Sequence, residues 1–329
     1  MFWGVDSWHP VDPKTGKALS KWIHNPFAGS LSASGDRGIL ATTGVQFSFR
    51  LVGPDEMELE MASFKKLGGL PPTAFHAALK RGAVGTVSRR EWPDLSGSWR
   101  GKCLLAQPGG LKPSSVRLDL VRQDGELLWM DDVWSPTGPL TESTDPKALL
   151  RERMMGSLNP SGTGGVMTKA GVRVGFRMLS SDRMEVEFIR MAGEVEKPTA
   201  FYAVVRKGSE EPLAPVAKRM DLVGTWVGSY RYGLSDRPVD ATSTLVITRQ
   251  EGNILWADDV WIQPREKGDP VQHRDPMCGS LSPDQTHGAL AKKGACFMFR
   301  VLDADHLELA FTGIDTNPGA FFGLFNRKR

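Results

Sequence analysis

A domain-sized internal repeat is the feature that most constrains how this chain can fold. The phrase LLWMDDVWSP at 127–136 returns as ILWADDVWIQP at 254–264, and a shorter form, MFWGVDSWHP, occupies 1–10. The first tryptophans of these three phrases lie 126 and 127 residues apart. Because solenoid repeats span only about 20 to 50 residues, this period predicts successive domains, each with its own hydrophobic core.

The second and third copies of the repeat are complete. The first copy matches them only from the tryptophan phrase onward. DLSGSWRG at 94–101 and DLVGTWVG at 221–228 open the complete copies. Further along, GVRVGFRMLSSDRMEVEF at 171–188 matches GACFMFRVLDADHLELAF at 294–311 and GVQFSFRLVGPDEMELEM at 44–61. We therefore predict three units, of which the first lacks its two opening strands: 1–84, 94–207 and 221–329.

Apolar and polar residues alternate along each unit, which predicts antiparallel strands. In the third unit an alternating run extends from Phe297 to Val301 and resumes after LDAD from Leu307 to Phe311. Alternate residues of a strand face the same side, so these two runs form a hairpin with one apolar face. The pattern recurs in the other units. It predicts an all-β chain with about seven or eight strands in each complete unit.

The opposite face of this hairpin places an arginine across from a glutamate in every unit. Cross-strand pairs of opposite charge contribute a few tenths of a kcal/mol to about 1 kcal/mol. We interpret them as ion pairs on a solvated face rather than as catalytic pairs: Arg50 with Glu58, Arg177 with Glu185, and Arg300 with Glu308.

The opening strands resemble those of the calycin barrels. Each carries Gly-x-Trp-x-Gly, as GSWRG at 97–101 and GTWVG at 224–228, and meandering hairpins follow. This is similar to avidins, lipocalins, fatty-acid-binding proteins and nitrobindins. The resemblance implies tandem antiparallel up-and-down β-barrels, with a β-sandwich as the open alternative. It also implies that Trp99 and Trp226 are buried at the closed barrel ends. The families' ligand signatures are missing, so no biotin, fatty acid or haem follows.

One face of the tryptophan phrase keeps an aspartate and a tryptophan in all three units. Such a pair can bind a sugar or a cation, because the ring stacks while the carboxylate accepts hydrogen bonds. In the structural alternative, the tryptophan closes the barrel end and the aspartate binds the backbone of the next loop. The candidate ligand-binding residues are Asp6, Trp8, Asp132, Trp134, Asp259 and Trp261.

No catalytic residue, metal site or cofactor is predicted. The adjacent carboxylates Asp131 and Asp132 point to opposite faces of a strand, so they cannot act together on one substrate. The six histidines do not recur at matched positions, and no metal-binding histidine spacing is present. The serines of the recurring GSL tripeptide lack the surroundings of a nucleophile elbow and are predicted turn residues: Ser30, Ser157 and Ser280.

Composition narrows the setting of the protein. A net charge of +3 over 329 residues, with basic and acidic residues interleaved, argues against binding to nucleic acid. No apolar run reaches the length of a membrane span, and the first ten residues do not read as a signal peptide. Three cysteines form a poor disulfide framework. We therefore predict an intracellular, soluble protein, with a targeting segment upstream of residue 1 left open.

The sequence favours a non-enzymatic protein whose barrels bind a small apolar or aromatic ligand, or whose outer faces make it a scaffold or assembly subunit. Two alternatives stay open. One is a barrel enzyme of the isomerase type acting on a small hydrophobic substrate, and the other is a lectin-like binder that uses the Asp/Trp pairs. The barrel interior distinguishes these functions: polar groups beside an empty space favour ligand binding or catalysis, whereas a filled interior favours a scaffold.

The incomplete first unit predicts a protein partner. An open sheet has two bare edges and one uncovered apolar face, the latter containing Phe47, Phe49 and Leu59. The chain could be a fragment, a second polypeptide could supply the missing strands, or the sheet could pack on a neighbouring unit. The short linker at 85–93 argues against the third outcome, so residues 1–84 are the expected partner-binding surface.

Overall fold

The computed structural model describes residues 2–8, 23–32, 34–65, 71–82, 91–107, 110–135, 146–191, 198–213, 220–233, 238–263, 270–313 and 319–328. Within these residues the chain forms 23 strands and a single 3-10 turn, η1 (Pro146–Ala148). The prediction of an all-β chain is therefore confirmed. In this part of the chain no helix is long and apolar enough to cross a bilayer.

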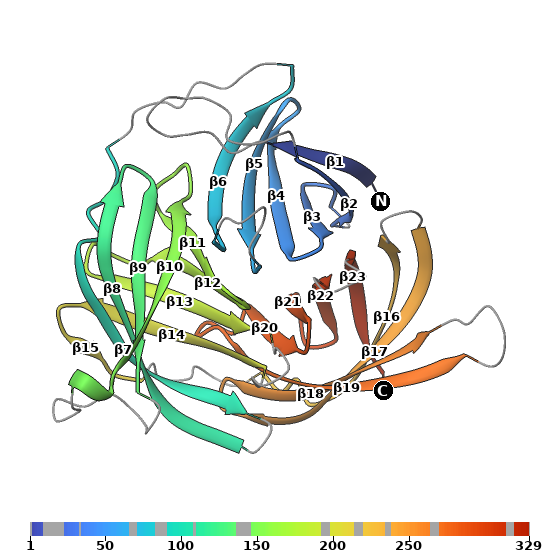
Figure 1. Ribbon diagram of the computed structural model, residues 1–329. Coiled ribbons are helices and arrows are strands. Elements are labelled where there is room, and N and C mark those ends of the chain that lie inside the picture. Colours follow the sequence, from blue (N-terminus) through green and yellow to red (C-terminus); the bar gives the residue numbers. More distant parts are fainter. Residues whose placement is uncertain are drawn as a thin grey trace.

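The two complete units are closed antiparallel barrels of eight strands each, as the sequence predicted (Figure 1). In the first barrel β14 pairs with β7, and a short strand, β15, adds parallel to β7 outside the ring. Its strands are β7 (Gly97–Gln107), β8 (Gly110–Asp124), β9 (Leu127–Trp134), β10 (Leu150–Leu158), β11 (Gly164–Lys169), β12 (Val172–Met178), β13 (Arg183–Arg190), β14 (Thr199–Lys207) and β15 (Glu210–Glu211).

The second barrel closes where β23 pairs with β16. Every other neighbouring pair in it is consecutive in the chain, which is the up-and-down topology. Its strands are β16 (Gly224–Gly233), β17 (Pro238–Glu251), β18 (Ile254–Gln263), β19 (Val271–Leu281), β20 (His287–Lys292), β21 (Ala295–Val301), β22 (His306–Gly313) and β23 (Gly319–Lys328).

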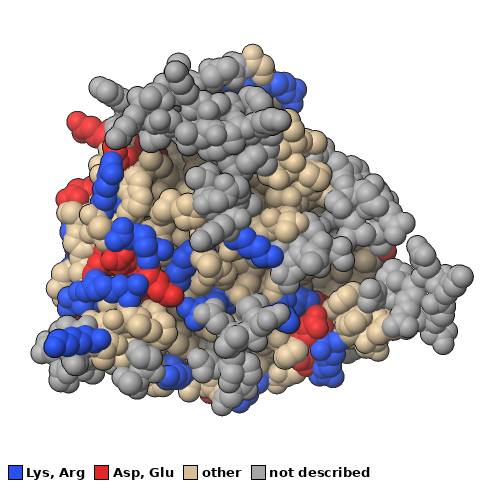
Figure 2. All heavy atoms as spheres, in the orientation of Figure 1, with Lys and Arg blue, Asp and Glu red and all other residues tan. Residues whose placement is uncertain are grey.

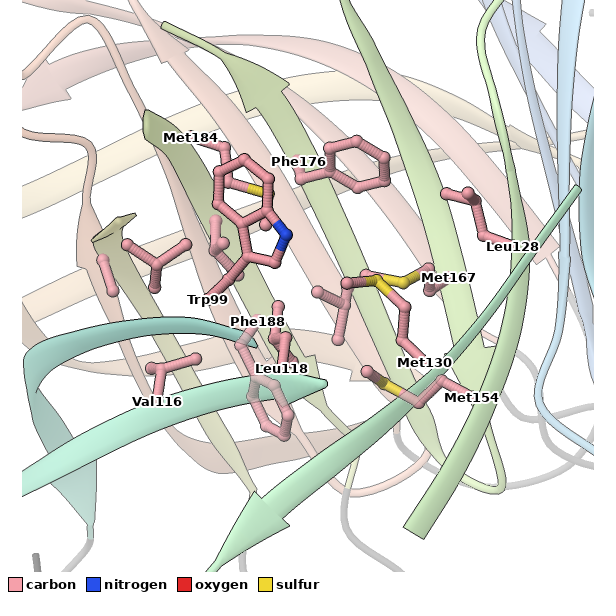
Figure 3. Close-up of a cluster of buried hydrophobic side chains, with 14 of the residues drawn as sticks. Trp99, Val116, Leu118, Leu128, Met130, Met154, Met167, Phe176, Met184 and Phe188 are labelled. Atoms are coloured by element: carbon pink, nitrogen blue, oxygen red, sulfur yellow. The ribbon is translucent and has the colours of Figure 1, made fainter. Parts of the chain in front are cut away.

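The tryptophan of the Gly-x-Trp-x-Gly strand is buried at one end of each barrel. Trp99 and Trp226 are 0% exposed, and their indole N–H groups donate to the carbonyls of Leu95 and Leu222, both at 2.9 Å. Trp99 belongs to one buried cluster with side chains such as Met184 (Figure 3). The glycine that follows has no room for a side chain: a Cβ on Gly101 would lie 2.1 Å from a carbonyl oxygen of β14. The burial of both tryptophans, which the resemblance implied, is therefore confirmed.

The first unit is an open antiparallel sheet whose six strands run in chain order. They correspond to the last six strands of each barrel. The last strand of the sheet, AFHAALK, contains residues that favour helices. It is nevertheless a strand, like its aromatic and β-branched counterparts β14 and β23. The strands are β1 (Phe2–Trp8), β2 (Ile23–Leu31), β3 (Arg37–Thr42), β4 (Val45–Gly53), β5 (Glu56–Ser63) and β6 (Ala74–Lys80).

The three units form a closed ring in which one contact is used three times (Figure 1). The last strand of each unit packs against the GSL strand of the next: β6 against β10, β14 against β19, and β23 against β2. A head-to-tail contact that is repeated between similar units builds a closed ring when each contact rotates the next unit by a whole fraction of a full turn. Three units of one chain therefore pack like the subunits of a cyclic trimer.

The outer face of the open sheet is buried against both barrels, which corrects the expectation that it would not pack on its neighbours. Ala62, Phe64 and Ala74 share a buried cluster with residues of both barrels, and Ile39 and Ala41 pack on β22 and β23. Alanine at the contacts allows the sheets to approach closely. The short linker at 85–93 does not prevent this packing, because the ring arrangement of the three units brings the open sheet against both barrels. The inner face is covered only in part: Phe47 is 6% exposed, whereas Phe49 and Leu59 are half-buried.

The GSL serines lie in strands rather than in turns, which corrects the prediction made for them. All three are buried, in the strands that form the contacts between units. Ser157 Oγ accepts a hydrogen bond from the backbone N–H of His76 in the first unit, at 2.7 Å. The tripeptide recurs because a small residue is needed where one sheet packs on another.

The predicted cross-strand ion pairs form in all three units. The closest contacts are 2.8 Å for Arg50–Glu58, 2.6 Å for Arg177–Glu185 and 3.1 Å for Arg300–Glu308. The arginines are exposed, but the glutamates of the two barrels are buried, so the face is only half solvated. Basic and acidic side chains are intermixed over the first complete barrel on the face seen in Figure 2.

Candidate functional site

Two of the three predicted Asp/Trp pairs can be placed. Asp132 and Trp134 lie on β9, and both line a cavity inside the first barrel. Asp259 and Trp261 hold the same positions on β18 of the second barrel. Asp131 points outward and accepts a hydrogen bond from Arg153 at 2.5 Å, as the alternation of the strand predicts. The side chains of Asp6 and Trp8 lie outside the described residues.

In the first barrel a buried lysine connects the members of this site. Lys169 Nζ donates to Asp132 Oδ2 at 2.7 Å and also to the carboxylate of Glu152. The indole N–H of Trp134 donates to the same Glu152 oxygen at 3.2 Å. Lys169 is 8% exposed, so its charge is compensated by two carboxylates rather than by water. Asp132 and Trp134 are thus joined in one network.

The second barrel repeats the network with different acids. Lys292 Nζ donates to Asp259 at 2.7 Å and to Asp275 at 2.8 Å. Trp261 donates to Asp275 at 3.0 Å, as Trp134 does to Glu152 in the first barrel. Sequence analysis missed the lysine and the second acid. The available signal was the matched position of the lysines, each two residues before a glycine in TKAG and AKKG.

The lysine keeps the second carboxylate of each network ionised. Burial raises the pKa of Glu152, but the hydrogen bond and charge of Lys169, with the Trp134 N–H, outweigh it and hold that pKa below its ordinary value. The pKa of Asp275 is likewise lowered, because Lys292 and Trp261 overcome the effect of burial. Glu152 and Asp275 are therefore carboxylates at neutral pH and are not poised to act as general acids.

The open sheet lacks the charged partners of this network. Asn25 pairs with Asp6 in the β1–β2 register, where the barrels place Glu152 and Asp275. Thr42 stands at the position of the two lysines. The lysine and the acid have thus changed together, which agrees with the rule that a buried charge is kept only with its partner.

The barrels differ in how their interiors are filled. In the second barrel Tyr230 stacks on Phe321 with ring centroids 3.6 Å apart, Phe321 stacks on Phe311 at 5.0 Å, and Phe297 packs on Phe311 at 5.0 Å. This aromatic plug is incomplete in the first barrel. The pair of Phe188 and Phe201 remains, with centroids 4.8 Å apart, but the other two rings are replaced by smaller side chains.

The missing rings leave a cavity. Cys103 stands at the position of Tyr230 and Val174 at that of Phe297, and both line a space of about 170 Å³ in the first barrel. Its other walls combine apolar side chains with polar ones, among them Lys112, Asp132 and Arg190. Burial raises the pKa of the Cys103 thiol to about 12, so the sulfur is a neutral wall and not a nucleophile. The principal lining residues are Cys103, Leu118, Asp132, Trp134, Val174, Phe188, Arg190 and Phe201.

The two aspartates differ in what they offer a ligand. Asp259 is 4% exposed and uses both oxygens, one for Lys292 and the other for the hydroxyl of Ser243 at 2.8 Å. In the first barrel Val116 takes the place of Ser243, so Asp132 Oδ1 receives no hydrogen bond from that position. Asp132 therefore directs one acceptor oxygen toward a cavity, whereas Asp259 serves the structure of its barrel.

Comparison with known proteins gives no family. No family model matches the chain, and no curated protein matches it. Among solved structures, a protein of unknown function of the DUF3598 family from Nostoc punctiforme is 12% identical, with a TM-score of 0.32, covering 71% of this chain and 96% of that one. Transferrin binding protein B from serogroup B Neisseria meningitidis is 10% identical, with a TM-score of 0.20, covering 91% of this chain and 68% of that one.

Proposed function

We propose that the first complete barrel binds a small, mostly apolar molecule in the cavity beside Asp132 and Trp134. The observation that carries this proposal is the loss of two aromatic rings from one barrel while the other keeps them. An empty apolar cavity destabilises a protein by about 24 cal/mol per Å³. This cost applies to the apolar part of the 170 Å³ space, where Val174 and Phe188 form the wall, and a ligand that fills that part offsets it.

The volume and the polar lining define the ligand class. A cavity of about 150 Å³ lined by apolar side chains is large enough for benzene, so this one suits a single aromatic ring or a branched aliphatic group. Asp132 lines the cavity as a hydrogen-bond acceptor and favours a ligand that donates a hydrogen bond through a hydroxyl or amino group. A small phenol-like molecule meets both requirements.

Filling the cavity should abolish this binding without unfolding the barrel. In Val174→Phe the new ring would occupy the position that Phe297 holds in the second barrel. We expect no loss of stability, because added atoms enter an existing space rather than a packed core. Native mass spectrometry of protein purified from its source should show a bound small molecule that is missing from the variant.

Two controls distinguish loss of the ligand from loss of the fold. Phe297→Val changes the matching position of the second barrel and should leave the ligand of the first barrel in place. Urea unfolding of Val174→Phe should show a midpoint at or above that of the unmodified protein. A Val174→Phe protein that is folded and still carries the ligand would refute the proposal.

A second proposal concerns the partner of the open sheet, namely a polypeptide that adds a strand to β1. The strands equivalent to β1 are β9 and β18, which pair with β8 and β17 on the corresponding edge. In the described residues β1 pairs with β2 alone, and Val5 is 59% exposed. Because the outer face of the sheet is covered by the barrels, this edge is where the missing hairpin would pair.

Hydrogen exchange tests the strand addition. Alternate amides of 2–8 should exchange quickly in the isolated protein and slowly once a partner strand has bound, whereas amides of β4 should be protected in both states. Uniform protection of 2–8 in a protein that sediments as a monomer would contradict the proposal.

A further inference from the structure

The inner face of the open sheet is exposed at positions that are buried in both barrels. Phe75 is 37% exposed and Leu79 is 44% exposed, both on the last strand, β6. The strand registers place Leu79 where the barrels have Val205 and Phe325, which are 0% exposed. Met57, the cross-strand partner of Leu79, is half-buried. The open sheet therefore presents an apolar surface that each barrel covers with its own strands.

In the barrels these positions surround the tryptophan of the opening strand. Trp99 lies in one buried cluster with Phe176, Met184 and Val205, and Figure 3 labels the first three of these side chains. In the second barrel Trp226 is clustered with the side chains at the same three positions. The element that covers this surface in a barrel is thus the one that supplies an indole.

The open sheet keeps the apolar side chains that would surround such an indole. Phe49 stands at the position of Phe176, and Met57 at that of Met184, in the registers of the β4–β5 and β12–β13 pairs. We call Phe49, Met57 and Leu79 the indole pocket. Phe49 and Met57 are only half-buried, and Leu79 is exposed. Apolar side chains that remain exposed as a group mark a surface where another molecule binds.

A cation at the end of β6 extends the match. Over the indole of each barrel lies a basic side chain from the last strand: Lys207 at 5.9 Å from the ring centroid in the first barrel, and Arg327 at 5.3 Å in the second. Arg81 holds this position in the open sheet, two residues after Leu79. The backbone N–H of all three donates to an aspartate carbonyl in the preceding hairpin, which supports the equivalence. The Arg81 side chain is 80% exposed.

The two edges of the open sheet are those at which the barrels hold their opening hairpin. In the described residues β1 pairs only with β2, and β6 pairs only with β5. In each barrel the first strand of the opening hairpin pairs with the last strand, and its second strand pairs with the tryptophan phrase. A single hairpin can therefore satisfy both edges and cover the indole pocket.

We propose that the open sheet binds a β-hairpin of another polypeptide, whose first strand carries Trp-x-Gly. This inference rests on the strand addition to β1 proposed above, and it adds the second edge, β6, and the side chain that anchors the partner. The indole would enter the indole pocket beneath the guanidinium of Arg81. The glycine is needed for close approach to the last strand: in the second barrel a Cβ on Gly228 would lie 2.5 Å from the ring of Phe325.

A synthetic peptide of residues 221–251, the opening hairpin of the second barrel, serves as the probe. We expect a fluorescein-labelled peptide to bind the full chain saturably, as measured by fluorescence anisotropy. Hydrogen exchange should then show protection of amides in both 2–8 and 74–80. The peptide with Trp226→Ala should bind at least about tenfold more weakly, since a buried tryptophan is the kind of anchor that dominates binding.

Leu79→Glu in the full chain places a charge in the indole pocket and should weaken the binding of the unmodified peptide at least about tenfold. The fold should be kept, because the Leu79 side chain is already exposed, and an unchanged thermal unfolding midpoint checks this. Leu150→Glu is the matched control. Leu150 is also 44% exposed, but it lies at the start of β10 in the first barrel, so this variant should bind the peptide normally.

Three results would overturn the proposal. Equal binding of the two peptides, with protection confined to 2–8, would leave the strand addition to β1 in place but remove the tryptophan anchor and the second edge. The absence of saturable binding by the unmodified peptide would overturn the hairpin as the occupant. An isolated chain that sediments as a dimer, with both edges already protected, would identify a second copy as the occupant instead of another polypeptide.

Discussion

Replacing Arg173 by methionine is expected to lower the free energy of unfolding by about 3–5 kcal/mol, the usual effect of removing one partner from a buried ion pair. Arg173 is 8% exposed and lies between Glu60 of the open sheet and Glu187 of its own barrel. Without it, two carboxylates face each other at the centre of the ring with no cation between them. The contact between the open sheet and the first barrel should weaken most.

Urea unfolding followed by circular dichroism measures this effect, and pH gives a second signature. Glu60 has a pKa of about 2: burial raises it, but Arg173 and His76 lower it more strongly. Because this pKa is depressed, its contribution to stability is present above about pH 4.5 and is lost as the pH falls toward 2. In Arg173→Met burial dominates, so the pKa of Glu60 rises and acid no longer destabilises through this group.

An exposed pair supplies the control for the buried one. Arg274 binds Asp258 at 2.6 Å on the outer surface of the second barrel, and Arg274→Met should change stability by less than about 1 kcal/mol. A similarly small effect of Arg173→Met, with the acid dependence unchanged, would show that the central ion cluster does not hold the ring together.

Trp226→Ala is expected to destabilise the second barrel by about 3–5 kcal/mol, as for other large truncations in a core. The indole is fully buried, and it also satisfies the carbonyl of Leu222 at the entrance to the first strand. Its removal opens a cavity at the closed end and leaves that carbonyl without its donor. Trp99→Ala should have the same effect on the first barrel, since its geometry is the same.

Hydrogen exchange resolved by residue assigns this loss to a barrel. Amides of β16–β23 should lose protection in Trp226→Ala, while those of β7–β14 should lose far less, because each barrel has its own core. Trp256→Ala serves as a control, since Trp256 is partly exposed and packs against Arg249 with 3.9 Å from the guanidinium carbon to the ring centroid. A decrease of less than about 1 kcal/mol in the free energy of unfolding of Trp226→Ala would contradict its role in closing the end of the barrel.

The fold could be predicted because its determinants are local. Period-two alternation and the Gly-x-Trp-x-Gly strand depend on residues close together in the chain, and they led to barrels of about seven or eight strands. The repeat then carried this prediction from one complete unit to the other. The ring could not be predicted, because its contacts lie on outward-facing residues that seemed merely small, such as Ala41 and Ala291. Only the packing of three sheets shows why these positions cannot carry larger side chains.

The candidate site was predicted in part. The Asp/Trp pairs were found because they lie two residues apart on one strand face. Lys169 was missed because it reaches Asp132 only through the register of three adjacent strands. The cavity was missed for a different reason. Inward positions that the two barrels share do not indicate a cavity. The cavity depends on Cys103 and Val174, two inward positions at which the barrels differ.

The most direct test of the central claim is a calorimetric titration of phenol into three proteins. The unmodified chain should bind phenol at one site. The Cys103→Tyr/Val174→Phe variant, which gives the first barrel the aromatic plug of the second, should not bind it. The Tyr230→Cys/Phe297→Val/Ser243→Val variant, in which Asp259 Oδ1 also loses its hydrogen bond from Ser243, should gain a second site. Undiminished binding by the plugged variant, or no saturable binding by the unmodified chain, would contradict the account.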